Sequence, residues 1–247
     1  MFWEKTMKRN IFRTIALPLT VLALVSTMAL SASRPAQAQD AKSPYPTMAP
    51  LDQYLMDRDA EIALARSAAP ESISRDAEVM VLGKHGYETA VKGKNSFVCL
   101  VERGWASGID SPDFWNPKLR GPLCLNAAAA RTYLPHTIKK TEWVLAGQSR
   151  TQMFDSLKAA FDKKELPALE PGAMSYMLSK DGSLGDGNGA WRPHLMFFVP
   201  QIDAQAWGAN LAASPILAAE FPEDRLTIFL IPVAKWSDGK ADSMEQH

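Results

Sequence analysis

Short apolar runs occur in two groups, within residues 79 to 102 and within residues 173 to 233, and a region of helical periodicity separates them. The first group consists of runs at residues 79 to 82, 87 to 91 and 96 to 102, which are rich in β-branched and aromatic residues and are joined by glycine-containing turns. This pattern predicts three antiparallel strands. The third run is apolar on both faces, so we expect it to be a central strand that is covered on both sides.

The second group predicts three more strands, at residues 173 to 179, 194 to 199 and 226 to 233. The order of elements therefore predicts an α+β domain, in which helices pack on a mainly antiparallel sheet of about six strands in two groups of three. Helices are expected at residues 51 to 68, from Asn126 to Leu134 with a stop at Pro135, at residues 141 to 145, and from about 153 to 164. Residues 201 to 224 are expected to hold short helical turns.

The first 38 residues have the composition of a secretory signal peptide. Four basic residues precede an uncharged apolar run from Ile15 to Leu30, and Ala36-Gln37-Ala38 provides a small-x-small cleavage site. The competing interpretation is an uncleaved membrane anchor, but Pro18 interrupts the run, which is short for a membrane-spanning helix. We therefore predict a signal peptide at 1–38, an extended proline-rich leader at 39–50 and a single α+β domain at 51–247.

Removal of this segment changes the charge of the protein. The segment contains five basic and one acidic residue, so 22 of the 27 basic and 26 of the 27 acidic residues remain, a net charge of −4. A mildly acidic chain without a basic run does not favour binding to nucleic acid or to anionic lipid. The mature protein is expected to be periplasmic or secreted, without a stable membrane anchor.

The two cysteines, Cys99 and Cys124, are predicted to form a disulfide in an oxidising compartment. The alternative is a pair of buried or reactive thiols, but the Cys-x-x-Cys spacing typical of redox catalysis is absent from the sequence. Residues 104 to 122 contain several glycines and prolines and are expected to form an irregular loop. This loop is either a lid over a binding site or a segment held in place by the disulfide.

One histidine and two serines could form a catalytic arrangement. If residues 173 to 179 and 194 to 199 form a hairpin, His194 lies near Ser179 or Ser175, which suits a periplasmic hydrolase with a serine nucleophile. The sequence has no Gly-x-Ser-x-Gly motif and no evident third member. A histidine hydrogen-bonded to a neighbouring backbone carbonyl is the alternative.

Aromatic residues and His194 could instead line an apolar pocket for a small ligand. The candidates are Trp105, Trp115, Tyr176, Trp191, His194 and Trp207. Glu102 and Arg103 end the central strand and could face a partner charge or a ligand carboxylate, but the default expectation is an ordinary exposed ion pair. The four histidines lack metal-binding spacing, and the glycine-rich residues 181 to 189 lack the ligand pattern of an EF-hand, so no metal site and no cofactor are predicted.

Five segments of the chain resemble an uncharacterised family of exported bacterial proteins that bear signal peptides. They are Phe97-Val98-Cys99-Leu100-Val101-Glu102-Arg103, Phe114-Trp115-Asn116-Pro117-Lys118, Gly172-Ala173-Met174-Ser175-Tyr176-Met177, Pro193-His194-Leu195-Met196-Phe197-Phe198 and Trp207-Gly208-Ala209-Asn210. The resemblance implies a single exported domain and assigns no activity.

Three functions therefore stay open. The domain is expected to bind a small, partly apolar ligand, because its aromatic residues outnumber any convergent set of titratable groups. The alternatives are the hydrolase described above and an envelope protein-interaction module that uses apolar loops.

Overall fold

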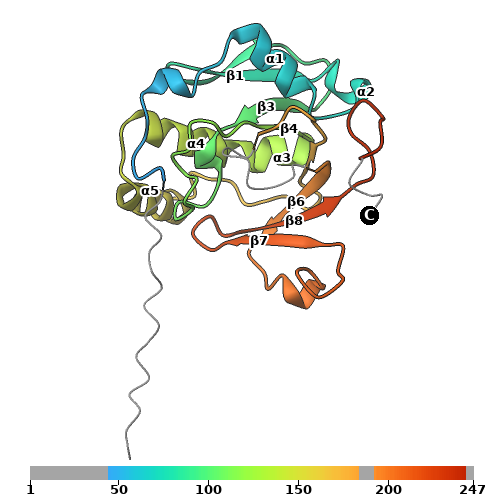
Figure 1. Ribbon diagram of the computed structural model, residues 1–247. Helices are drawn as coiled ribbons and strands as arrows, with labels where there is room; N and C mark the ends of the chain where they lie inside the picture. Colours follow the sequence, from blue (N-terminus) through green and yellow to red (C-terminus); the bar gives the residue numbers. More distant parts are fainter. Residues whose placement is uncertain (1–43, 184–191, 243–247) are drawn as a thin grey trace, which may run out of the picture. The chain divides into compact units, whose positions relative to one another are not determined.

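Eight strands form one sheet in the order β2-β1-β3-β4-β5-β6-β8-β7 (Figure 1). The computed structural model describes residues 44–183 and 192–242, all of which belong to the second of two units, Asp40–His247. The strands are β1 (Glu78–Gly83), β2 (Gly86–Val91), β3 (Val98–Glu102), β4 (Gly121–Leu125), β5 (Met174–Met177), β6 (His194–Pro200), β7 (Leu217–Phe221) and β8 (Leu226–Pro232).

Five α-helices and three short 3-10 helices accompany the sheet in the described part of the chain. The α-helices are α1 (Arg58–Arg66), α2 (Glu71–Ser74), α3 (Ala127–Thr132), α4 (Leu134–Leu145) and α5 (Arg150–Asp162), and the 3-10 helices are η1 (Leu51–Gln53), η2 (Gly104–Ala106) and η3 (Gln205–Trp207). The α+β class predicted from the sequence is therefore confirmed.

The sheet is mixed, which corrects the expectation of three antiparallel strands in the first group. The β1–β2 hairpin is antiparallel, but β1 and β3 pair in parallel, with Glu78 opposite Val98 and Val79 opposite Cys99. The hairpin leaves β2 at the edge of the sheet, and the connection after β2 returns the chain to the other side of β1. All other pairs of neighbouring strands are antiparallel.

The prediction of about six strands was wrong because β4 and β7 were not recognised. Of these two strands, β4 begins with Gly121 and Pro122, two residues that strands disfavour, yet Pro122 pairs with Val101 of β3. The second contains Ala218 and Ala219, which favour helices, but its pairing with β8 overrides this preference. Residues 201 to 224 therefore contain a strand in addition to the expected turns.

Two expected helix boundaries also change. Residues 51 to 68 form η1 and α1 as separate helices, and α1 begins where the side chain of Asp57 accepts hydrogen bonds from the backbone N–H groups of Asp59 and Ala60. Pro135 lies in the first turn of α4, where its missing N–H costs no helical hydrogen bond. The prediction that Pro135 ends a helix is therefore wrong. The longer helix expected from about residue 153 is confirmed as α5.

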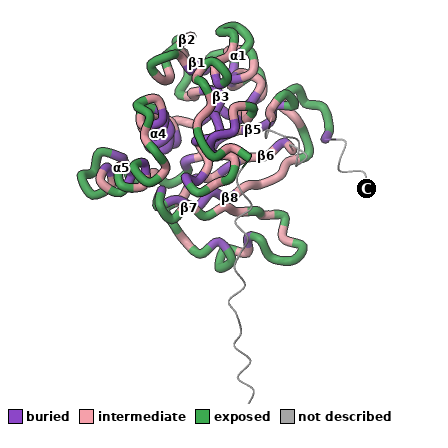
Figure 2. The backbone as a smooth tube through the Cα atoms, turned by 60° about the vertical axis from the view of Figure 1, so that its left-hand side comes forward, coloured by how far each residue is buried: buried purple, intermediate pink, exposed green. Residues whose placement is uncertain are grey.

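Helices cover the sheet on two faces (Figure 1). The N-terminal helices α1 and α2 pack over β1, β3 and β4, where small buried residues such as Ala65, Ala68 and Ala69 allow close approach. Helices α3 and α4 contact the opposite face, where Tyr133 stacks on Phe198 at a centroid distance of 3.9 Å. Figure 2 shows the buried residues concentrated in the central strands and along α4.

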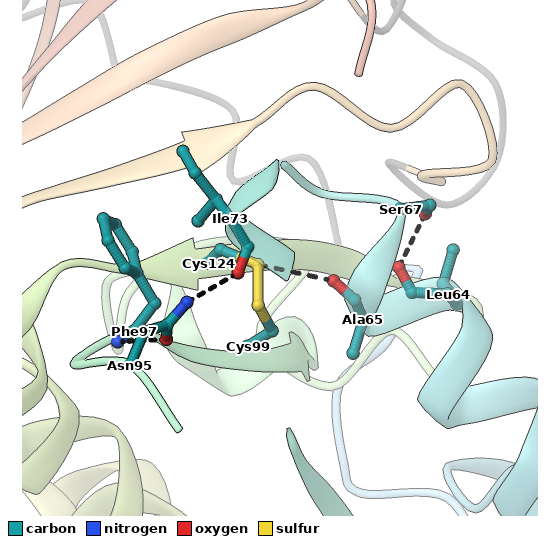
Figure 3. The surroundings of a disulfide bond; sticks show 8 residues. All are labelled: Leu64, Ala65, Ser67, Ile73, Asn95, Phe97, Cys99 and Cys124. Carbon is teal, nitrogen blue, oxygen red and sulfur yellow. Dashed lines mark hydrogen bonds between the residues drawn. A yellow bond between two sulfur atoms is a disulfide. The ribbon is translucent and has the colours of Figure 1, made fainter. Parts of the chain in front are cut away.

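The predicted disulfide is confirmed and joins two neighbouring strands. Cys99 of β3 and Cys124 of β4 face each other directly, with 4.0 Å between their Cα atoms. Figure 3 shows the bond beneath the C-terminal end of α1, where the Sγ of Cys124 lies 3.7 Å from the carbonyl oxygen of Ala65. Both cysteines are fully buried.

The predicted signal peptide lies outside the described residues and stays a prediction. Among residues 44–183 and 192–242, no helix has the length and apolar character needed to cross a membrane.

Candidate functional site

A cavity of about 500 Å³ lies on the α4 side of the sheet, at the end where β3 stops and β4 and β6 begin. Its floor is formed by side chains of the strands, among them Met177, Met196, Ile228 and Leu230. The register explains why they meet: Met196 is directly opposite Leu230, and His194 is directly opposite Met177, so these side chains share one face of the sheet.

The loop between β3 and β4 contributes Ala106, Ser107 and Leu119 to the cavity wall. Two contacts with α4 hold this loop: the indole N–H of Trp105 donates to the hydroxyl of Thr141 at 3.0 Å, and the ammonium of Lys140 contacts the carbonyl oxygen of Ser107 at 3.5 Å. The sequence left open whether this stretch is a lid or a loop held by the disulfide. In the structure it lines the cavity, and the disulfide joins the two strands that flank it.

Glu102 is the acidic residue of the cavity wall. Its side chain is only 7% exposed, and its Oε1 accepts hydrogen bonds from the hydroxyls of Tyr133 at 3.0 Å and Thr137 at 3.1 Å. Burial raises the pKa of this carboxyl to about 7, although the two hydroxyl donors and the charge of Lys140 act in the opposite direction. The carboxyl therefore changes charge near neutral pH.

The expected exposed ion pair between Glu102 and Arg103 is not what the structure shows. Arg103 is fully buried and points to Glu61 of α1, whose Oε1 lies 2.9 Å from its guanidinium. The same guanidinium donates to the backbone carbonyls of Tyr54 and Val101. The guanidinium of Arg103 is therefore paired with Glu61 and not with Glu102, although both Arg103 and Glu102 line the cavity.

His194 lines the cavity, and its Nδ1 lies 2.7 Å from the carbonyl oxygen of Arg192. Because a carbonyl can only accept, Nδ1 carries the proton in this contact. Burial lowers the pKa of the imidazole, although the hydrogen bond to Arg192 raises it. Burial therefore favours the neutral form of His194.

The two serines proposed as nucleophiles have different surroundings. The hydroxyl of Ser179 is 2.6 Å from that of Ser67 and accepts a hydrogen bond from the backbone N–H of Asp181. Ser175 is directly opposite Met196, two pairs away from the pair that contains His194, and its buried Oγ has no hydrogen-bond partner among the described residues. Neither serine belongs to the cavity wall. The hydrolase hypothesis therefore gains no support from these contacts.

The aromatic candidates are dispersed, and among the described ones only His194 lines the cavity. Trp105 and Trp115 are buried in a separate core with Tyr54, whose hydroxyl donates to the carbonyl oxygen of Trp115. Tyr176 packs near Phe97 on the disulfide side of the sheet. Trp191 lies outside the described residues.

Trp207 is 64% exposed and stacks on Phe229 of β8 at a centroid distance of 5.4 Å. Leu211 and Leu217 are each 50% exposed in the same part of the chain, but Leu217 is opposite Leu230 and also lines the cavity. These three side chains are the large exposed apolar residues of the described part of the protein, which is the feature that an interaction module would use.

No group of three or more His, Cys, Asp or Glu side chains within residues 44–183 and 192–242 is placed to hold a metal ion. Most of the glycine-rich segment, residues 184 to 189, lies outside this part of the chain.

Sequence reasoning named Glu102 but expected it to be exposed, and it missed the phenol of Tyr133 and the methionines that line the cavity. The signal available was a charged residue directly after a strand that is apolar on both faces, because such a strand is covered at both sides. A charge at its end is then buried unless the covering elements stop short of it.

Searches for related proteins found no family model, no curated protein and no solved structure that matches this chain.

Proposed function

We propose that this protein is exported and that its folded domain binds a small, mostly apolar molecule in the cavity beside Glu102. The observation that supports binding is a cavity of about 500 Å³ with mainly aliphatic walls and a few polar groups. Ligand sites in proteins usually have this volume and this composition. The disulfide supports export, because such bonds persist mainly in oxidising compartments.

The composition of the wall favours binding over acid and base chemistry. Strand side chains such as Met196 and Leu230 provide flexible and branched apolar surface, and methionine adapts to ligands of irregular shape. The polar groups of the wall include the carboxyl of Glu102, from β3, and the phenol of Tyr133, the residue before α4. Such an arrangement encloses an apolar body and orients one polar group.

Native mass spectrometry of the protein purified from its own cells is the first experiment. We expect a stoichiometric small molecule that is lost when the protein is denatured. If the bare polypeptide mass is found, titration with N-phenyl-1-naphthylamine, a neutral apolar dye whose fluorescence rises in apolar surroundings, tests the empty cavity.

A substitution that fills the cavity locates the binding. A Cβ placed on Gly121 would lie 3.7 Å from the Cβ of Glu102 and 3.7 Å from the Cε of Met177, so Gly121→Leu adds volume inside the cavity. Gly83→Leu, at the end of β1 and outside the cavity wall, is the matched control. The proposal is supported if Gly121→Leu loses dye binding and Gly83→Leu keeps it.

Trp207→Ala tests the competing site for the dye. Unchanged dye binding in Gly121→Leu, together with loss of binding in Trp207→Ala, assigns the apolar surface around Trp207 to the dye. That result would overturn the cavity as the binding site.

A further inference from the structure

We propose that the ligand carries a positively charged nitrogen on an apolar skeleton and that this nitrogen binds the carboxylate of Glu102. The inference rests on the proposed binding function and adds the chemical class of the ligand. It follows from the charges in the cavity wall and from the geometry around one carboxylate.

The other ionisable side chains of the cavity wall have partners within the protein. Arg103 is paired with Glu61 at 2.9 Å, and Arg192 is paired with Asp242 at 2.9 Å. The imidazole of His194 donates to a backbone carbonyl. Among the charged groups of the wall in the described part of the chain, Glu102 is the one without an oppositely charged partner at salt-bridge distance.

The hydrogen bonds of Glu102 leave one oxygen for a ligand. Both hydroxyl donors, from Tyr133 and Thr137, contact Oε1, and they fix the orientation of the carboxylate. Within the described residues, Oε2 accepts no hydrogen bond. The absence of a side chain at Gly121, directly opposite Glu102 on β4, leaves room for an approaching group.

A cation satisfies this carboxylate better than a neutral donor. A buried carboxylate without a counter-ion is costly, and the attraction between opposite charges is strongest where water is excluded. Hydrogen bonds between ionised groups are about twice as strong as those between neutral groups. An ammonium group on an apolar chain therefore matches both the carboxylate and the aliphatic wall, whereas a carboxylate ligand is repelled.

Three probes with the same ten-carbon chain separate the contribution of the head group from that of the apolar body. Decylamine, 1-decanol and decanoate are titrated below their micellar concentrations by displacement of N-phenyl-1-naphthylamine at pH 8. For the wild-type protein we expect decylamine to bind about tenfold more tightly than 1-decanol, and decanoate to bind most weakly.

Glu102→Gln keeps the shape of the side chain and an oxygen that accepts from Tyr133 and Thr137. We expect it to lose about tenfold in affinity for decylamine and to keep its affinity for 1-decanol. Glu142→Gln, on the exposed side of α4, removes the same charge away from the cavity and controls for net charge. Its affinity for decylamine should equal that of the wild type.

The outcomes distinguish the two proposals. Equal affinity of the wild type for decylamine and 1-decanol, or an unchanged preference in Glu102→Gln, overturns the cationic ligand and leaves the cavity as an apolar binding site. If none of the three probes displaces the dye and Gly121→Leu still binds it, the proposed function fails together with this inference. The ranking of the three probes on the wild type holds as a test even if Glu102→Gln does not fold.

Discussion

The ammonium group of Lys140 lies 2.7 Å from Oδ1 and 2.8 Å from Oδ2 of Asp224, and each side chain is 5% exposed. Lys140 belongs to α4, and Asp224 lies in the turn before β8. The same ammonium contacts the carbonyl oxygen of Ser107 in the loop that lines the cavity. One buried ion pair therefore connects three segments that surround the candidate site.

Removal of one member of this pair should be more damaging than removal of both. Lys140→Met leaves the carboxylate of Asp224 buried without a counter-ion, so we expect the free energy of unfolding to fall by about 3 to 5 kcal/mol. The double variant Lys140→Met/Asp224→Asn should recover most of this loss, because no uncompensated charge remains. Urea denaturation of Lys140→Met, Asp224→Asn and the double variant measures the coupling energy between the two side chains. Strictly additive losses of stability would contradict the prediction.

The disulfide should contribute to stability without affecting ligand binding. Cys99 and Cys124 are 25 residues apart, and the bond between them lowers the entropy of the unfolded chain. On the chain-entropy model this raises the free energy of unfolding by about 3 to 4 kcal/mol. The double variant Cys99→Ala/Cys124→Ala should lose about that amount in urea denaturation. Both cysteines belong to the core beneath α1, and neither lines the cavity, so dye affinity should stay within twofold of the wild type.

The parts of the fold that the sequence predicts are those whose local pattern and tertiary environment agree. The apolar run around Cys99 is a central strand, and the helical spacing of Met153 and Leu157 belongs to α5. Where the two disagree, tertiary pairing decides. Pro122 and Ala218 lie in strands because they pair with Val101 of β3 and Phe229 of β8, and this pairing cannot be recognised from the sequence around Pro122 or Ala218.

The candidate site depends on contacts that no local pattern reveals. The carboxyl of Glu102 is buried because Tyr133 and Thr137, more than thirty residues later, turn their hydroxyls to it and because the loop after β3 folds over the sheet. The hydrogen bond of His194 to the neighbouring carbonyl oxygen of Arg192 is the arrangement that the sequence left as the alternative to catalysis. The tryptophans were predicted to line a ligand pocket because their side chains are large and apolar. Such side chains are equally suited to core packing, and Trp105 is buried in the core.

The raised pKa of Glu102 predicts how stability depends on pH. A carboxyl that binds its proton more tightly in the folded state contributes stability fully below the unfolded pKa of 4.5, and this contribution is lost as the pH rises to the folded pKa of about 7. Between pH 4.5 and pH 8, wild-type stability should therefore fall relative to that of Glu102→Gln by about 3 kcal/mol.

Urea denaturation of both proteins across this pH range measures the difference. The lowered pKa values of His136 and His194 act in the opposite direction, because the contribution of a buried neutral imidazole to the stability of the folded protein is lost as the pH falls. Both histidines are present in the two proteins, so the difference isolates the carboxyl. A difference that does not change with pH would show that Glu102 is solvated in the folded state.

Two neighbouring serines should respond differently to the same substitution. The hydroxyl of Ser175 is buried without a partner among the described residues, so Ser175→Ala should leave stability unchanged or raise it by about 1 kcal/mol. Ser179→Ala removes contacts with Ser67 and with the N–H of Asp181 and should cost about 1 to 2 kcal/mol. Thermal unfolding of the two variants compares them directly, and a large loss in Ser175→Ala would reveal a hidden partner for its hydroxyl.

Asn210 protects the exposed edge of the sheet, and its removal should cause self-association. Its side chain accepts from the N–H of Ala218 and donates to the carbonyl of the same residue, both at 2.9 Å, so it occupies the positions that another strand would use. Asn210→Ala exposes this edge beside Leu211 and Leu217 and also places alanine at a φ of 57°, which costs about 1 to 2 kcal/mol.

Asn210→Gly separates the two effects, because glycine adopts this φ without strain but lacks the amide. We expect sedimentation velocity to show concentration-dependent association in both variants, with the larger loss of stability in Asn210→Ala. If Asn210→Gly sediments like the wild-type protein at every concentration, the hydrogen bonds to Ala218 stabilise the loop alone. In that case the short length and the exposed Glu220 of β7 are sufficient to prevent pairing with a second copy.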